Sequence, residues 1–217
     1  MHNVVVVMPI RGRQAQSIEC MNRLIKTASY PATYIAVGGI DDRDTVSAVA
    51  KANAPACMPM YYNDAKATYW QALKIATIGL PDDALIVNVA NDLLPAVHWL
   101  RNAISSYDNF GSDYVIGFNG DGYKHEHSCH FMISMKHINE FGGWPIWYHH
   151  NFGDTEIIMR ATHQRRYLKD VFAILFHNHP IVAGAPNDDV YTEGSSTFEF
   201  DRQLFEKRKA AQWSLPS

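Results

Sequence analysis

The stretch Val4-Val5-Val6-Val7-Met8-Pro9, close to the N-terminus, decides the fold class of this chain. It holds five apolar residues in a row without polar alternation, a pattern typical of a strand that is buried on both faces. Strands of this kind occur in parallel sheets whose two faces are covered by helices. We therefore predict a central parallel strand that ends at Pro9, because proline has no amide hydrogen for the sheet ladder.

Segments of strand and helix character alternate downstream of this strand. Short apolar runs predict further strands at residues 34–38, 58–62, 84–89 and 114–118. Apolar residues at helical spacing predict helices at residues 18–28, 45–54, 65–78 and 96–106. This order favours right-handed βαβ units. The sequence therefore predicts an α/β fold with a mainly parallel sheet flanked by helices.

The regular alternation weakens after residue 110. Residues 111–180 contain a histidine-rich stretch, a Gly-Gly-Trp-Pro turn and a helix predicted from Asp154 to His163. Residues 181–217 end in a charged helix, predicted from Asp201 to Trp213, that we expect on the outside. Neither a repeat nor a linker separates these parts, so we expect the 217 residues to form a single domain.

The composition excludes several classes of protein. The chain is 47% hydrophobic and 19% charged, which is ordinary for a globular protein. A net charge of −3 provides no basic surface for nucleic acid. Three scattered cysteines do not form a disulfide framework, and neither a signal peptide nor a membrane-spanning run is present. We therefore expect a soluble, cytoplasmic protein.

Five short features stand in an order that resembles the GT-A glycosyltransferases, particularly glycosyltransferase family 2. They extend over residues 3–180 and comprise Pro9 after the first strand, acidic turns after the second and fourth strands, a Gly-Gly-Trp loop, and Gly153-Asp154-Thr155-Glu156 ahead of a helix with Arg160. The resemblance implies a Rossmann-related GT-A fold, with a nucleotide-binding half at residues 1–110 and an acceptor half at residues 111–180. It also implies a glycosyltransferase that moves a sugar from a nucleotide-diphosphate sugar to an acceptor hydroxyl with inversion. The expected donor, by default, is a UDP-sugar, and the expected acceptor is a glycan or another hydroxyl compound.

The donor side is expected where the predicted strands end. Ligands of such sheets bind at the carboxyl ends of the strands, and a diphosphate needs positive charges. The alternative explanations for the candidate residues are that the arginines and the lysine are solvent-exposed surface charges and that the aspartates form an ordinary turn. The candidate nucleotide-binding residues are Pro9, Arg11, Arg13, Asp41, Asp42, Lys66 and Asn91.

A divalent cation, Mn²⁺ or Mg²⁺, is also implied by the resemblance. Asp92 follows the fourth strand, where the family carries an acidic motif, and carboxylate oxygen suits such cations. Ala90 and Asn91 stand where further carboxylates are expected, so the motif is reduced. A late histidine often completes the metal site in the family, and His177 or His179 matches it, with a slight preference for His179.

The acceptor side is expected between residues 142 and 156. Asp154 matches the family's catalytic base, which takes the proton of the attacking hydroxyl, although an aspartate there is also an ordinary helix N-cap. Glu156 is the second candidate and should point away from Asp154. The aromatic residues predicted to contact the acceptor sugar, or else to pack in the core, are Trp144, Trp147 and Tyr148.

Three alternatives remain open. His125, His127, Cys129 and His130 could form a zinc site, although their spacing is not a standard one. A sugar nucleotidyltransferase would use a similar sheet but a glycine-rich first loop, whereas residues 8–13 hold one glycine. A catalytically inactive nucleotide- or glycan-binding protein of the same fold is consistent with the reduced acidic motif at Asn91.

Overall fold

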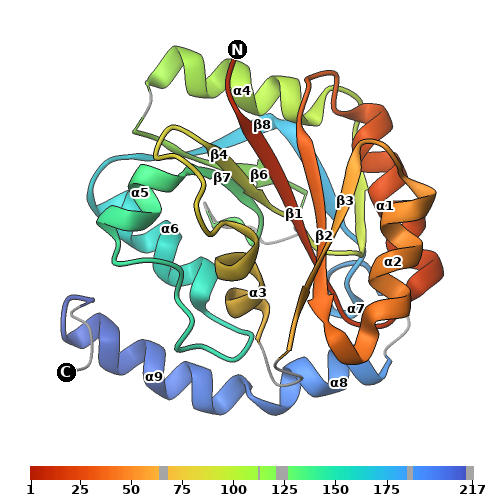
Figure 1. Cartoon of the computed structure of the whole chain (residues 1–217). Helices are drawn as coiled ribbons and strands as arrows, with labels where there is room; N and C mark the ends of the chain where they lie inside the picture. Colours follow the sequence, from red (N-terminus) through yellow and green to blue (C-terminus); the bar gives the residue numbers. More distant parts are fainter. Residues whose placement is uncertain (64–67, 112, 121–126, 185–187, 214–217) are drawn as a thin grey trace.

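A single mixed sheet forms the centre of the molecule in this computed structural model, which describes residues 1–63, 68–111, 113–120, 127–184 and 188–213 (Figure 1). Its strand order within these residues is β3-β2-β1-β4-β7-β6-β8-β5. The strands are β1 (Val4–Ile10), β2 (Thr33–Gly39), β3 (Cys57–Tyr62), β4 (Leu85–Asn88), β5 (Leu93–Pro95), β6 (Val115–Asn119), β7 (Phe131–Ser134) and β8 (Tyr167–His177).

The sheet is mostly parallel, as the sequence predicts. Strands β3, β2, β1 and β4 run parallel to one another, and β6 is parallel to β8. Strand β7 lies antiparallel between β4 and β6, and β5 is antiparallel to β8. The antiparallel β7 therefore joins the regular first half to the less regular second half.

Strand β1 is central and buried on both faces, which confirms the prediction from residues 4–8. Val6 and Met8 pack into one hydrophobic cluster, while Val5 and Val7 pack into the other. The strand continues through Pro9, which aligns with Val37 of β2, and ends at Ile10.

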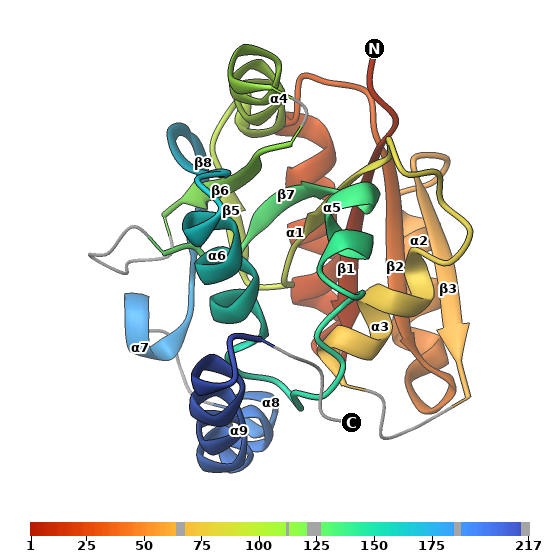
Figure 2. The ribbon, with the colours of Figure 1, turned by 90° about the vertical axis from the view of Figure 1, so that its left-hand side faces the viewer.

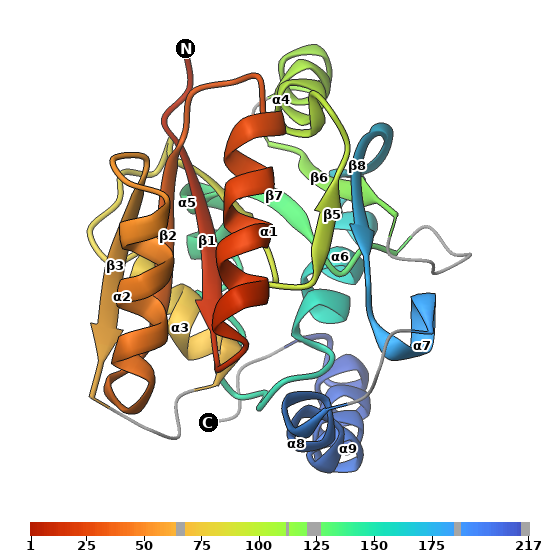
Figure 3. The same cartoon turned by 90° about the vertical axis from the view of Figure 1, so that its right-hand side faces the viewer.

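Helices cover both faces of the sheet. Helices α1 and α2 lie on one face and α3, α5 and α6 on the other (Figures 2 and 3). The elements that form these layers are α1 (Gln14–Thr27), η1 (Ile40–Asp42), α2 (Arg43–Ala52), α3 (Tyr69–Ala76), α4 (Trp99–Phe110), α5 (Met135–Glu140) and α6 (Gly153–His163). None of the helices in the described ranges is both long enough and apolar enough to cross a membrane.

The C-terminal part crosses the end of the molecule at which β1, β2 and β3 finish (Figure 1). It consists of α7 (Pro180–Ala183), α8 (Asp189–Ser196) and α9 (Phe198–Ala210). From its charges we expected helix α9 to lie on the outside of the molecule, but part of it is buried. Its Asp201, Phe205 and Arg208 are all buried, so the tail is part of the packed structure.

A glycine sets how closely α6 approaches α3. A Cβ atom at Gly153 would overlap the indole ring of Trp70. Because Gly153 has no side chain, the first turn of α6, which carries Asp154, can lie directly against α3.

Candidate functional site

The predicted donor-side residues lie together at the carboxyl ends of β1, β2 and β4. Arg11, just after β1, lies 3.8 Å from the carboxylate of Asp41 on η1. The Gly12 amide donates a hydrogen bond to Asp42. Asn91 is buried, and its amide donates to the Ser17 hydroxyl on α1 at 3.0 Å. Pro9 lies at the end of β1, and Lys66 lies outside the described residues.

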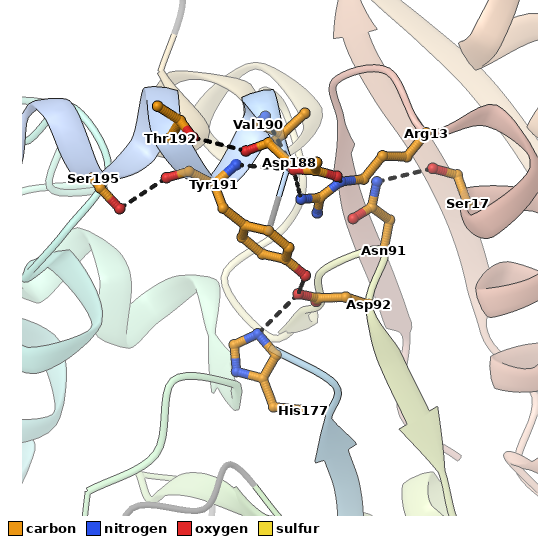
Figure 4. A network of polar contacts seen from close by, with 10 residues as sticks. All are labelled: Arg13, Ser17, Asn91, Asp92, His177, Asp188, Val190, Tyr191, Thr192 and Ser195. Atoms are coloured by element: carbon orange, nitrogen blue, oxygen red, sulfur yellow. Dashed lines mark hydrogen bonds and ion pairs between the residues drawn. The ribbon is translucent and has the colours of Figure 1, made fainter. Parts of the chain in front are cut away.

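Asp92 is the buried carboxylate of this group. Its Oδ2 atom accepts a 2.8 Å hydrogen bond from the Tyr191 hydroxyl and lies 3.2 Å from His177 Nε2 (Figure 4). Its Oδ1 atom is buried and has no hydrogen-bond partner among the described residues. Burial by itself would raise the pKa of Asp92, but His177 and the Tyr191 hydroxyl together hold that pKa well below its ordinary value. Asp92 is therefore ionised at neutral pH.

The two candidate histidine ligands have different surroundings. His177 contacts Asp92, whereas the ring of His179 packs edge-on against Tyr191, with 4.6 Å between the ring centroids. Burial lowers the pKa of His179, and neighbouring His177 lowers it further. The structure thus brings His177, not the slightly preferred His179, into contact with Asp92.

The described residues of the alternative zinc site contact groups from both sides of the candidate site, and His127 and Cys129 share the neighbour Asp154. His127 lies beside Asp154, and the ring of His130 lies 5.1 Å from that of His177 between centroids. His125 is outside the described residues. Within the described part of the chain, no group of three or more His, Cys, Asp or Glu side chains is arranged to hold a metal ion.

Asp154 lies in the first turn of α6 and is partly exposed. Its Oδ2 atom is 3.6 Å from His127 Nε2, and its Oδ1 atom accepts a 2.8 Å hydrogen bond from the Thr155 amide. Burial would raise the pKa of Asp154, but His127 and the Thr155 amide lower it overall. The N-cap of α6 is Phe152, so Asp154 does not have the N-cap position that was its alternative explanation.

The prediction that Glu156 is a second candidate for the catalytic base needs correction, because this residue is part of the core. Only 1% of it is exposed, and Arg208 of α9 donates to both of its oxygens at 2.8 Å. The Tyr148 hydroxyl and the Trp147 indole also donate to it, at 2.9 and 3.3 Å. With these partners Glu156 has no free oxygen for a substrate proton, and its role is to bind α6 to α9.

Two of the three predicted acceptor-binding aromatics also belong to the core. Trp144 is buried, donates to the Thr77 hydroxyl at 2.9 Å and stacks on Trp70. Tyr148 is fully buried. Trp147 is half-buried, and its ring lies 3.8 Å from the guanidinium of Arg208. Of these three, Trp147 alone keeps surface that could contact an acceptor.

Tyr69 is a site residue that the sequence analysis did not select. Its hydroxyl accepts a 3.3 Å hydrogen bond from Asn88, the last residue of β4. Burial raises the pKa of Tyr69, and the negative charges of Asp154 and Asp92 add to the rise. Tyr69 therefore lies within the field of both carboxylates. The sequence signal that could have pointed to this site is Asn88, the partner of Tyr69, because it is a polar residue inside the apolar run 84–89.

The segment at residues 188–193 was also missed. Asp188 pairs with Arg13 and Tyr191 binds Asp92 (Figure 4). Glu193 pairs with Arg11. These contacts join residues between 99 and 182 positions apart, so a local pattern could not reveal them.

Comparisons with known proteins find similarity at the level of structure. No protein-family model and no curated protein sequence matches the chain. The mannosyltransferase PcManGT from Pyrobaculum calidifontis, solved with GDP-Man and Mn²⁺, has a TM-score of 0.66 at 15% identity over 81% of this chain and 56% of its own. TarS 1–349 from S. aureus has a TM-score of 0.65 at 13% identity over 82% of this chain and 61% of its own. This chain thus spans about three fifths of the length of these two proteins.

A synthase is also similar in structure. The 4-diphosphocytidyl-2C-methyl-D-erythritol synthase from Anaerococcus prevotii has a TM-score of 0.56 at 9% identity, over 84% of this chain and 97% of its own. The mannosyltransferase has the highest TM-score of these three structures. The chain therefore has the GT-A-type fold that the sequence resemblance predicted.

Proposed function

We propose that this protein is a glycosyltransferase that moves a sugar from a nucleotide-diphosphate sugar to an acceptor hydroxyl. The observation that carries the proposal is a pair of carboxylates from different elements whose charges both act on Tyr69. Asp92 follows β4, Asp154 begins α6, and both act electrostatically on the Tyr69 hydroxyl. Both have lowered pKa values despite burial, so both are ionised at neutral pH.

The two carboxylates suit different tasks in such a transfer. Asp154 is partly exposed and accepts the proton of the acceptor hydroxyl as that oxygen attacks the anomeric carbon. The nucleoside diphosphate leaves from the opposite face of the sugar, where Arg11 and Arg13 bind its phosphates. Attack and departure on opposite faces invert the anomeric configuration.

The residues around Asp92 fit a divalent cation. Its buried Oδ1 atom has no partner among the described residues, and an ionised carboxylate oxygen is a suitable ligand for Mn²⁺ or Mg²⁺. Asp92 and His177 would hold the cation, with further ligands from the donor phosphates. A bound cation would supply positive charge that stabilises the leaving diphosphate.

The experiment is an assay of nucleoside diphosphate release from a panel of GDP- and UDP-sugars with Mn²⁺ or Mg²⁺ and candidate glycan acceptors. We expect release in the wild type with at least one donor. Asp154→Asn should reduce the rate by roughly 10²- to 10⁴-fold, the usual contribution of a general base, while nucleotide binding is retained. Asp83→Asn changes an exposed carboxylate that precedes β4, whereas Asp92 follows β4, so this variant is the matched control and should behave as the wild type.

Other outcomes favour other assignments. Unchanged release by Asp154→Asn would show that the base is another residue. Pyrophosphate release from a nucleoside triphosphate and a sugar phosphate would indicate a nucleotidyltransferase, whose sheet is also similar. Nucleotide binding without any release would indicate an inactive binding protein. An Asp92→Asn variant whose nucleotide binding still depends on Mn²⁺ as in the wild type would contradict the cation assignment.

A further inference from the structure

Residues 188–193, which begin α8 and which we call the α8 strap, bind the side chains that the proposed function assigns to the donor. The guanidinium of Arg13 forms a bidentate ion pair with the carboxylate of Asp188, with 2.6 Å between Arg13 Nε and Asp188 Oδ2. The same guanidinium lies 3.8 Å above the ring of Tyr191. As a result, only 9% of the Arg13 side chain is exposed.

The strap also binds Arg11 and Asp92, the other two donor-side groups that it contacts. Arg11 donates to both oxygens of Glu193, at 2.9 and 3.1 Å. The Tyr191 hydroxyl donates to Asp92 Oδ2 at 2.8 Å (Figure 4). The strap therefore binds three of the four groups proposed to hold the diphosphate or its cation, namely Arg11, Arg13 and Asp92.

These contacts resemble those that a donor would make. A guanidinium presents the same fork of N–H groups to a carboxylate and to a phosphate. Asp188 and Glu193 thus offer Arg13 and Arg11 the kind of charge that a diphosphate would offer. A diphosphate and the strap cannot use the same forks together.

We propose that the α8 strap is an autoinhibitory element that occupies the donor site and is displaced when a nucleoside diphosphate group binds. This inference rests on the proposed function and adds the regulation of that site. Donor binding then includes the free energy of releasing the strap, and any change that weakens the strap strengthens nucleotide binding.

The packing of the C-terminal part allows such a release. Helix α8 has no buried residue among those described, and the side chains of Asp188 and Glu193 are 43% and 58% exposed. Helix α9, in contrast, is anchored by buried Asp201 and Arg208. The strap can therefore leave while α9 stays in place.

The test measures the binding of GDP and UDP, with Mn²⁺, by calorimetry. We compare the wild type with the double variant Asp188→Asn/Glu193→Gln, which keeps the shape of the strap and removes the two charges that pair with Arg13 and Arg11. The double variant should bind about tenfold more tightly, within the usual range of coupling between sites. Asp189→Asn, on the same helix without a charge pair among the described contacts, should bind as the wild type does.

Amide hydrogen exchange of residues 189–196 provides a second measurement that needs no substrate. Exchange should be faster in the double variant than in the wild type, and GDP or UDP with Mn²⁺ should also make it faster in the wild type. The strap proposal alone would be overturned if the wild type and the double variant bound nucleotide with equal affinity. It would also be overturned if neither GDP nor UDP changed the rate of amide exchange at residues 189–196. If neither protein bound any nucleotide, the proposed function would fail and the strap proposal with it.

Discussion

Glu156 and Asp154 lie two positions apart on α6, and their carboxylates face different surroundings. Successive residues of a helix are rotated by about 100°, so these two side chains point in nearly opposite directions. Glu156 points into the core, where Arg208 binds both of its oxygens. Asp154 points toward His127. The sequence predicted this divergence correctly, but it could not show which partner buries Glu156.

Removing the charge of Glu156 should destabilise the whole protein. In Glu156→Gln the buried guanidinium of Arg208 loses the carboxylate to which it donates two 2.8 Å hydrogen bonds, and breaking a buried ion pair typically costs about 3–5 kcal/mol of unfolding free energy. Urea unfolding followed by circular dichroism measures this loss. Glu199→Gln removes an exposed partner of Arg202 on the same helix α9 and should leave the urea midpoint nearly unchanged. A Glu156→Gln midpoint equal to that of the wild type would contradict the role we give this pair.

The lowered pKa of Asp154 should make its contribution to stability depend on pH. Because the folded-state pKa is below the ordinary value of 3.8, the ionised form is stabilised in the folded protein. The stabilisation is fully present above the unfolded pKa of about 3.9 and is lost as the pH falls through the lower folded pKa.

Chemical unfolding of wild type and Asp154→Asn at several pH values tests this linkage. The difference in unfolding free energy between them should be constant from about pH 7 to about pH 5 and should shrink below about pH 4. His127→Gln removes the main group that lowers the pKa, so in that background the pH-dependent part of the difference should be smaller. A difference that stays constant down to about pH 2 would contradict the shift.

At the scale of elements, α9 holds the loop that precedes α6. Asp201 is fully buried, and its two oxygens accept hydrogen bonds from the amides of His149, His150 and Asn151 at 2.8 to 2.9 Å. Three consecutive N–H groups therefore converge on one carboxylate. Because this loop leads into Asp154 at the start of α6, the C-terminal helix helps to position the proposed base.

Asp201→Asn should loosen this loop. The asparagine side chain has one acceptor oxygen and no charge, so at least one of the three amides loses its partner, at a cost of about 1–3 kcal/mol. Amide exchange at residues 149–151 should become faster, and the unfolding free energy should fall. Glu206→Gln, an exposed position of the same helix, is the control. Unchanged exchange at all three amides would show that the loop holds its conformation without Asp201.

The elements of the first half could be predicted because their patterns are local. The run at residues 4–8 specifies burial on both faces, and the strand ends that follow from it bring Arg11 beside Asp41. Helix α8 gave no such signal, because residues 189–196 are mostly polar and bury no side chain among those described. Its function in the structure comes from contacts with distant residues, which periodicity does not encode.

At the scale of the whole molecule, the two halves form one body around two shared cores. The cluster that contains Val6 also contains Leu175, and the cluster that contains Val5 also contains Phe205. The sequence left two roles open for Trp144 and Tyr148, acceptor binding or core packing, and the structure shows core packing. A flat ring suits a sugar or a core equally well, and only the packed molecule shows that Trp144 and Tyr148 are buried.

The contact between Asp92 and Tyr191 has a consequence for the order in which the chain acquires its site. The two residues are 99 positions apart, and Asp92 and His177 are 85 positions apart. Closing such long loops is slow compared with forming local helices. During synthesis Arg11, Arg13 and Asp92 leave the ribosome before His177, so the nascent chain carries an incomplete donor site until His177 has emerged.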